Sequence, residues 1–318
     1  GISDMNITVN RPASRTWNFL GVNGAKIEWG EGTELSETRL SLPADKSAGR
    51  LSAVSEPEGE YSEKRIILDT RPGEEVTLLE TVRGDESFLT RLEINAESDT
   101  RVRVLQLFMP GSDAVLRHES ELMLGSGAEV SFITATLGDG DIYADTHCEL
   151  SGDGASFSSD IGYLCRGENR INVNLTVEHT GKNTECRIDA SGALTDSAKK
   201  DFCGTIDFKK GCSGSRGAEN ETVLLLGEGA ENKTLPVILC AEENVEGTHG
   251  ATVGELDEPT LFYFESRGIS REEAERMMAR AAIVRVASLS RDEEYTDAVL
   301  SALDALLCSP ENGGTADA

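Results

Sequence analysis

The sequence has 318 residues, 57 acidic and 30 basic, so its formal charge is −27 at neutral pH. Hydrophobic residues make up 38%, enough for a sizeable core, and the length suits one large or two ordinary domains. A surface this acidic repels nucleic acid and anionic lipid, because phosphate binding requires clustered Lys and Arg.

The chain is predicted to begin with an irregular segment and to continue as a long array of strands. Residues 1–33 form the irregular lead-in, which contains turn-forming pairs such as Arg11-Pro12. From residue 34 to residue 255, alternating polar and apolar runs indicate many short strands. The run at 170–177 alternates strictly, which predicts one buried face. The side chains expected on that face are Ile171, Val173, Leu175 and Val177.

Glycine-rich turns separate these runs, and a Gly-x-Gly-Ala unit begins at Gly125, Gly152 and Gly227. No helical period of useful length occurs among the strand-like runs. A long array of short strands suits a solenoid, a sandwich or a barrel. We favour a β-helix over 34–255, because a sandwich seldom needs so many strands.

The C-terminal part has a helical pattern, which predicts a small α-helical domain over 256–308 at the end of the β-helix. A short helix should begin at Asp257-Glu258-Pro259 and stop at Arg267-Gly268. Capping boxes at 270–273 and 290–293 predict two amphipathic helices, and residues 309–318 are expected to be a disordered tail. The predicted apolar stripes are Ala274, Met277, Met278 and Ala281 in the first of the two, and Tyr295, Ala298, Val299, Ala302, Leu303 and Leu306 in the second.

Several features predict a cytoplasmic protein without a membrane partner. No run of 18 apolar residues occurs, so we expect no transmembrane helix. The first residues show no basic region followed by an apolar stretch, so no signal peptide is expected. The seven cysteines include no Cys-x-x-Cys pair, and their odd number indicates free thiols in a reducing compartment.

We expect no enzymatic activity from this chain. Residues 227–234 resemble a phosphate-binding P-loop, but Asn232 replaces its second glycine, and Glu228 and Glu231 would repel phosphate. Neither a Gly-x-Ser-x-Gly elbow nor a His-Glu-x-x-His motif occurs. Any ATP chemistry must therefore come from a partner.

The histidines and cysteines are the remaining candidates for metal chemistry. Cys240 ends an apolar run, which favours packing as a small hydrophobic residue over metal ligation. His249 lies among glycines, and a neutral imidazole can bind iron or zinc, but a structural role is the alternative for a lone histidine. The other histidines in strand-like segments are expected to be structural or exposed: His118, His147 and His179.

Three segments in the C-terminal third carry a resemblance to a known family. They read Leu-Pro-Val-Ile-Leu-Cys at 235–240, Asn-Val-Glu-Gly-Thr-His-Gly-Ala-Thr-Val-Gly at 244–254 and Leu-Phe-Tyr-Phe-Glu-Ser-Arg-Gly-Ile-Ser at 261–270. Together they closely resemble the SufB/SufD family of iron–sulfur cluster assembly proteins. The resemblance covers roughly residues 170 to 288 well and the earlier strands only by pattern.

This resemblance implies a right-handed parallel β-helix and a C-terminal helical domain. It also implies a scaffold subunit that works with a SufC-type ATPase and a SufB-type subunit, with no stably bound cofactor and at most a transient iron–sulfur cluster. The ATPase would dock on the C-terminal helices. The residues predicted to bind this partner are Phe262, Tyr263, Arg267, Met277 and Met278.

Two departures from the SufB pattern favour the SufD type. Ala230 stands where SufB-type chains carry a cysteine, and Gly250 stands where they carry a glutamate after the histidine. In SufD-type chains, the histidine that matches His249 is implicated in cluster formation. Cys240 and Glu246 are weaker candidates for the same site.

Three alternatives remain open from the sequence. The chain lacks the long N-terminal extension common in the family, so it could be the sole SufB/SufD-like scaffold of a compact system, acting as a homodimer. It could be a structural partner without metal contact. A carbohydrate-active β-helix protein is the third, which the aromatic content of only 5% disfavours.

Overall fold

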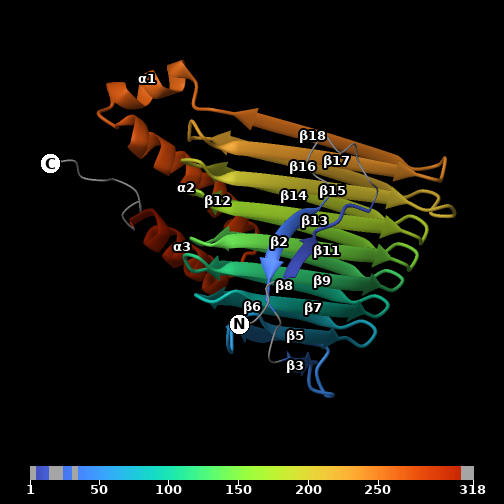
Figure 1. Cartoon of the computed structure of the whole chain (residues 1–318). Coiled ribbons are helices and arrows are strands. Elements are labelled where there is room, and N and C mark those ends of the chain that lie inside the picture. The colour runs from blue at the N-terminus through green and yellow to red at the C-terminus, as the bar shows by residue number, and fades with distance from the viewer. Residues whose placement is uncertain (1–4, 14–23, 31–34, 309–318) are drawn as a thin grey trace.

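The computed structural model describes residues 5–13, 24–30 and 35–308, so the tail predicted at 309–318 lies outside the described residues. Within this part of the chain, two parallel eight-stranded sheets are followed by α-helices. Figure 1 shows the strands stacked along one axis, from β3 at one end to β18 at the other. The predicted β-helix core with C-terminal helices is confirmed.

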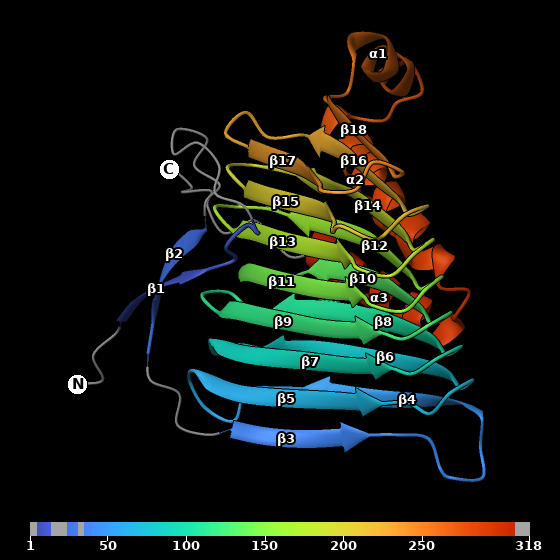
Figure 2. The ribbon, with the colours of Figure 1, turned by 90° about the vertical axis from the view of Figure 1, so that its right-hand side faces the viewer.

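Successive strands alternate between the two sheets, which we call the odd sheet and the even sheet. Each odd strand and the even strand after it form one rung, and Figure 2 shows the rungs from the side. The odd sheet contains β3 (Leu35–Leu40), β5 (Ser62–Asp69), β7 (Phe88–Ala96), β9 (Val115–Leu124), β11 (Asp141–Leu150), β13 (Arg170–His179), β15 (Lys199–Phe208) and β17 (Glu231–Cys240). The even sheet contains β4 (Ala48–Ser55), β6 (Glu75–Gly84), β8 (Arg101–Pro110), β10 (Glu129–Leu137), β12 (Ser156–Cys165), β14 (Glu185–Leu194), β16 (Arg216–Leu225) and β18 (Glu246–Gly254).

The space between the sheets, here called the lumen, holds the main core. Its side chains come from alternate positions of each strand, as the period of two requires. In β13, Ile171, Leu175 and Val177 are buried there, and Val173 is partly buried against the same cluster. The face predicted from the 170–177 pattern is therefore confirmed.

Four-residue turns join the odd strand to the even strand in most rungs. In the Gly125 and Gly152 units, the amide of the fourth residue donates to the carbonyl of the first, and the third residue, Gly127 or Gly154, has a positive φ. Equivalent turns place Asp99 and Asn183 in the same left-handed conformation, which these residue types tolerate better than most. The fourth residue is buried in each of these turns: Thr100, Ala128, Ala155 and Thr184.

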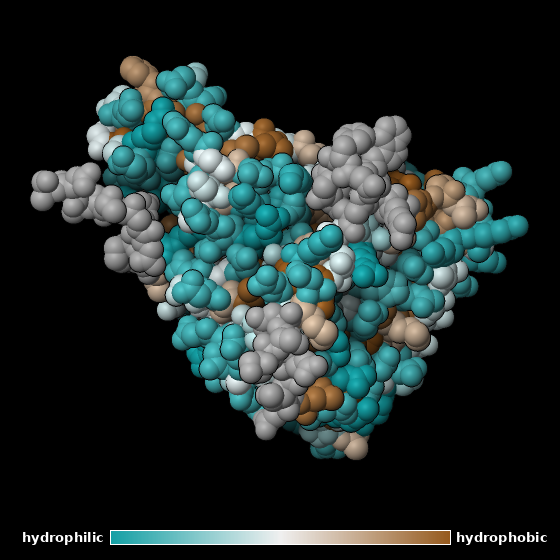
Figure 3. All heavy atoms as spheres, viewed as in Figure 1, coloured by the Kyte–Doolittle hydropathy of each residue, from teal (hydrophilic) through white to brown (hydrophobic). Residues whose placement is uncertain are grey.

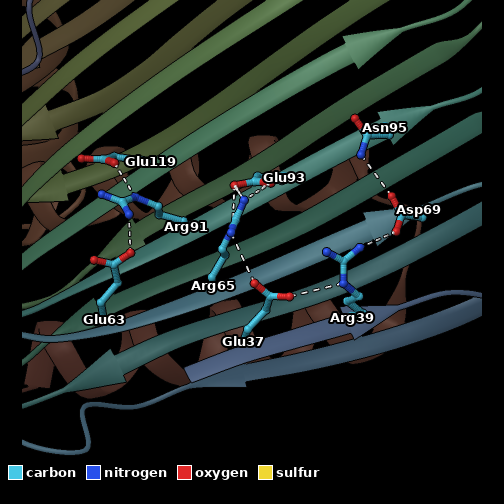
Figure 4. A network of polar contacts seen from close by, with 9 residues as sticks. All are labelled: Glu37, Arg39, Glu63, Arg65, Asp69, Arg91, Glu93, Asn95 and Glu119. Atoms are coloured by element: carbon cyan, nitrogen blue, oxygen red, sulfur yellow. Dashed lines mark hydrogen bonds and ion pairs between the residues drawn. The ribbon is translucent and has the colours of Figure 1, made fainter. Parts of the chain in front are cut away.

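The outer face of the odd sheet carries ladders of opposite charges that run across the rungs. Figure 4 shows Arg65 between Glu37 and Glu93, and Arg91 between Glu63 and Glu119. Adjacent parallel strands lie about 4.8 Å apart, so facing charges of opposite sign reinforce the pairing register. This face is accordingly polar where no other element covers it.

The lead-in predicted to be irregular contains a two-stranded antiparallel hairpin of β1 (Met5–Val9) and β2 (Ala25–Trp29). The strands are only five residues long, which left too few alternating positions for recognition from sequence. Val9, Ile27 and Trp29 form a small core with Leu89 and Tyr143 of the odd sheet. The hairpin therefore covers part of that sheet's outer face, as Figure 2 shows.

Three helices follow the strands: α1 (Glu258–Ser266), α2 (Arg271–Leu289) and α3 (Glu293–Cys308). As predicted, the side chain of Asp257 caps α1 by accepting from the Thr260 amide, and Ser270 caps α2 by accepting from the Glu273 amide. The capping box predicted at 290–293 is wrong, because Asp292 caps α3 by accepting from the Tyr295 amide, while Ser290 ends α2. No helix among the described residues combines the length and apolar composition needed to cross a membrane.

The prediction that the helices lie at the end of the β-helix is wrong for α2 and α3, which pack against the outer face of the even sheet. Helix α2 contacts β10, β12 and β14, and α3 contacts β8 and β10. The buried face of α2 differs from the predicted stripe, since Met277 and Ala281 are exposed and Ile283 and Val286 are buried. In α3 the predicted stripe is largely correct. Its buried members are Tyr295, Val299, Leu303 and Leu306, whereas Ala298 is exposed.

Candidate functional site

The last rung, β17 and β18, leaves the solenoid open at its C-terminal end. Among the described strands, β17 pairs only with β15, and β18 pairs only with β16, so each has one free edge. The rung exposes apolar surface as well, with Ile238 and Val253 36% and 49% exposed. Figure 3 shows hydrophobic atoms at the upper rim of the molecule, next to these strands.

His249 lies in the middle of β18 and faces the lumen side of the even sheet. A Cβ on Gly247 would contact Ile238 and Phe208, both on the lumen side of the odd sheet, so Gly247 faces inward. Alternation along the strand then places His249 on the same side. No further rung covers β18 among the described residues, and the imidazole is exposed.

The two weaker candidates do not join His249 in one cluster. Cys240 is the register partner of the buried Phe208, which places it on the lumen side at the far end of β17, where its thiol donates to the Glu242 carbonyl at 3.0 Å. Glu246 lies on the outer face of β18, with its carboxylate 3.7 Å from Arg216. No three His, Cys, Asp or Glu side chains of the described residues are grouped to hold a metal ion.

A charged cluster is buried in the lumen directly below the last rung. The ammonium group of Lys200 in β15 forms an ion pair with Glu221 in β16, and both side chains are almost fully buried. The Thr234 hydroxyl of β17 donates to the other Glu221 oxygen. Burial lowers the pKa of Lys200, against the opposing effect of Glu221. The pair is held in place because each charge has a partner within the low-dielectric core.

Glu219 lies two positions before Glu221 on β16, so it also points into the lumen. Burial, together with the negative charge of the neighbouring Glu221, raises the pKa of its carboxyl to about 8, although Lys200 has the opposite effect. In the ladder between β16 and β18, Glu219 is the register partner of His249. The two side chains are therefore neighbours on one face, one rung apart.

Two further polar atoms of this region are buried without a hydrogen-bond partner among the described residues. They are the hydroxyl of Tyr163 and the side-chain oxygen of Asn232. The ammonium of Lys200 lies 5.5 Å from the centre of the Tyr163 ring, a cation–π distance. The upper lumen thus combines charged and polar groups, whereas the main core below it is predominantly apolar.

The other histidines are accounted for by local contacts. His118 is buried and hydrogen-bonded to Thr90 and Gln106, and burial lowers its pKa to about 3. His179 is buried beside Thr184, and burial lowers its pKa to about 4. His147 lies on the outer face, where its hydrogen bond to Glu121 raises its pKa. The expectation of structural or exposed roles is therefore consistent with their positions.

The segment that resembles a P-loop forms a turn between β16 and β17. The Ala230 amide donates to the Gly227 carbonyl, and the chain continues directly into β17 rather than into a helix. A phosphate site of the P-loop type needs backbone amides gathered at a helix N-terminus. This turn does not supply that arrangement.

Most of the chain matches a known protein family. Residues 53–282 match the model of the SUF system FeS cluster assembly, SufBD core domain. The chain belongs to the SufBD family. This membership disfavours the carbohydrate-active alternative, and it agrees with the β-helix that carries the match.

Individual relatives identify the chain as a SufD-like member of the SufBD family. It is 32% identical to the iron–sulfur cluster assembly protein SufD of Bacillus subtilis over 154 residues, which cover 48% of this chain and 35% of the relative. It is 24% identical to Escherichia coli SufD over 241 residues, covering 74% and 57%. A SufBD family protein of Mycobacterium leprae is 23% identical over 252 residues, covering 77% and 64%. The matched region thus spans only part of each relative's length.

The residues predicted to bind a partner lie on α1 and its C-cap, which follow β18, and on the first half of α2. In this SufD-like chain, Figure 1 shows α1 standing beyond the end of β18. Phe262 and Tyr263 on α1 are 72% and 56% exposed, and the Arg267 guanidinium lies 5.2 Å from the centre of the Tyr263 ring. Met277 on α2 is exposed too. Met278 is partly buried and lines a groove of about 980 Å³ between α2 and the even sheet.

Sequence reasoning missed the buried cluster of Lys200, Glu219 and Glu221 in this SufBD-family chain. A signal was present: Gly217, Glu219, Glu221 and Val223 occupy alternate positions of one strand-like run. Two carboxylates on the same face as small and apolar residues indicate charge inside a core. Recognition required knowing which face of β16 is the inner one.

Proposed function

We propose that this SufD-like chain is a non-catalytic scaffold subunit of a SUF complex that assembles iron–sulfur clusters in the cytoplasm. It works there with a SufC-type ATPase and a SufB-type subunit, and it holds a cluster only transiently. The observation that carries the proposal is the open last rung, where His249 lies on the lumen side of β18, is exposed, and stands beside free strand edges. Support also comes from relatives whose names assign them to iron–sulfur cluster assembly.

In this proposal the SufB-type subunit covers the last rung. Free edges of β17 and β18 present unpaired amide and carbonyl groups, which another strand can satisfy by edge pairing. The exposed Ile238 and Val253 supply apolar surface for the same contact. A partner seated here would enclose His249 between two chains, where its nitrogen could reach iron.

The test of the site is His249→Ala in the reconstituted complex, measured by cluster absorbance, partner binding and melting temperature. The expected result is a marked loss of cluster formation with normal folding and assembly. Thr248→Ala is the matched control, because Thr248 is exposed on the outer face of the same strand. Normal cluster formation by the His249→Ala complex would refute the proposed role of this residue.

The ATPase is proposed to dock on α1 and the start of α2. Two adjacent aromatic rings on a short helix that projects from the body are a typical anchor for a protein partner. Phe262→Asp should abolish co-purification with the SufC-type ATPase, while Leu289→Asp, at the exposed far end of α2, should not. Equal binding by both variants would place the docking surface elsewhere. Point substitutions are preferable to deleting the helices, because deletion would expose Ile133 and its apolar neighbours on the even sheet.

A homodimeric scaffold is the second candidate, and the two free edges favour it because a second copy could satisfy them equally well. Light scattering of the purified chain distinguishes the two arrangements. A dimer that persists when the SufB-type subunit is added supports the compact system, whereas a monomer that pairs with this subunit supports the heteromeric one. In either case, the purified chain should hydrolyse ATP no faster than a buffer blank.

A further inference from the structure

Glu219 is anomalous among the buried charges of the solenoid. Glu219 is only 3% exposed and takes part in none of the hydrogen bonds or ion pairs described above, yet its oxygens are not among the fully buried atoms that lack a partner, so they keep some contact with solvent. The nearby Lys200 and Thr234 both bind Glu221 instead. The oxygens of this carboxyl are therefore available to accept from, or to bind, a group that enters from the solvent.

The surrounding backbone directs this carboxyl toward the centre of the lumen. A Cβ on Gly204 of the odd sheet would overlap with the carboxyl of Glu219, so the absence of a side chain at Gly204 makes room for the carboxyl. Glu219 therefore reaches across from the even sheet. Its position is constrained by the opposite strand rather than by hydrogen bonds.

One column of side chains on the lumen face of the even sheet contains Ile188, Glu219 and His249, in that order toward the open end. Ile188 is fully buried and apolar, so it offers no partner from below. His249 is the next residue of the column above Glu219, on a strand that lies about 4.8 Å from β16. Among the described residues of this column, the exposed imidazole of His249 is therefore the polar side chain next to Glu219.

A carboxylate and an imidazole on adjacent strands form a donor pair of defined chemistry. Nitrogen and oxygen donors of this kind suit divalent first-row metal ions such as Fe²⁺ or Co²⁺. Two donors from one chain leave the remaining coordination positions for water, sulfide or ligands from a partner.

We infer that Glu219 and His249 together form a half-site for a divalent metal ion at the open end of the lumen, with Glu219 as a direct ligand. The inference rests on the proposed function for the role of His249, and it adds Glu219 as the second donor of the same site. The ion reaches the pair through the open last rung. When the ion is bound, the carboxyl of Glu219 has the metal as its partner.

The experiment measures Co²⁺ binding to the full chain by calorimetry and visible absorption. The wild-type chain should bind one Co²⁺, and Glu219→Gln and His249→Ala should each weaken binding at least tenfold. Glu246→Gln, on the outer face of β18, should bind as the wild type does. Melting temperatures confirm that each variant is folded. If Glu219→Gln does not fold, Glu219→Asp replaces it and should bind at least threefold more weakly, because its carboxyl is withdrawn by one methylene.

Unchanged affinity in the folded Glu219 variant overturns the inference, and so does a wild-type chain that binds no Co²⁺. The outcome is separable from the proposed function. If Glu219→Gln binds Co²⁺ normally while His249→Ala blocks cluster formation in the complex, the proposed function stands and the half-site fails. If both variants lose Co²⁺ but the His249→Ala complex forms clusters normally, the half-site stands and the proposed role in assembly fails.

Discussion

The hydroxyl of Tyr295 donates a hydrogen bond to the carbonyl oxygen of Gln106 at 2.9 Å, which joins α3 to the outer face of β8. The same hydroxyl lies 3.1 Å from the carbonyl oxygen of Ile133 in β10. Tyr295 is fully buried, and burial raises the pKa of its hydroxyl. One side chain thus fixes the helix against two neighbouring strands.

Replacing Tyr295 by Phe removes this hydroxyl and leaves the ring in place. We expect a loss of about 1–2 kcal/mol in the free energy of unfolding, because the carbonyl groups lose a buried partner. Urea unfolding followed by circular dichroism measures the change. Tyr263→Phe, on the exposed surface of α1, should change stability by less than about 0.5 kcal/mol. Equal effects of both changes would mean that the buried hydroxyl contributes nothing specific.

Gly204→Ala should destabilise the chain by about 1–3 kcal/mol. The new methyl group would overlap with the Glu219 carboxyl and force it away from its present position. Gly254→Ala is the control, since no atom lies within 4 Å of a Cβ at that position. It should leave stability unchanged or raise it by up to about 1 kcal/mol through the unfolded state. A neutral Gly204→Ala would show that Glu219 moves without cost.

Lys200→Met should destabilise the chain by about 3–5 kcal/mol, because Glu221 would remain buried without its counter-ion. Adding Glu221→Leu should recover part of this loss by removing the uncompensated charge. Lys199→Met breaks an exposed pair with Glu231 and should cost less than about 1 kcal/mol. Chemical denaturation of the four proteins provides the comparison. A double variant less stable than Lys200→Met would contradict the argument.

Glu80 predicts a dependence of stability on pH. Its carboxyl is fully buried, Gln106 donates to one oxygen at 2.8 Å, and the other oxygen has no partner. Burial raises the pKa of Glu80 to about 7, from an ordinary value of 4.5. The unfolded chain therefore loses this proton at lower pH than the folded chain. The contribution to stability is complete below pH 4.5 and is lost as the pH rises toward 7.

Glu80→Gln should flatten the decline of stability between pH 4.5 and 7 by about 1.4 kcal/mol per pH unit. Unfolding free energies at half-unit intervals of pH give the slope. Glu75→Gln changes an exposed carboxylate on the same strand and should leave the slope as it is. An unchanged slope in Glu80→Gln would mean that Glu80 is ionised in the folded chain.

The strand array could be predicted because alternation is a local property, and the run at 170–177 shows it clearly. The repeat could not, because register partners are separated by as few as 26 residues, from Ser62 to Phe88, and by as many as 32, from Lys199 to Glu231. The turns also vary in sequence, since Gly127 and Asp99 both meet the same backbone requirement. Because the number of residues per rung varies, the sequence shows no fixed repeat length even though the strands stack regularly.

The candidate site was only partly predictable for the same reason. His249 was recognisable from its glycine-rich surroundings, but its neighbour Glu219 is set by register between strands one full rung apart. Without the rung length, no sequence rule identifies which residue lies below His249. The cap of α3 was missed on a smaller scale, because Ser290 and Asp292 both suit an N-cap, and only packing selects Asp292.

The contact of α2 with three successive even strands affects how the molecule can come apart. In a solenoid each rung touches mainly the rungs before and after it, so unfolding can start at an end and spread as a series of nearly independent steps. Because α2 spans β10, β12 and β14, loss of any one of these strands also costs the helix part of its support. The helix thus couples the rungs that contain β10, β12 and β14, so that they unfold together. Amide hydrogen exchange should accordingly be slowest and most uniform in β10 to β14, and faster in the rungs toward either end.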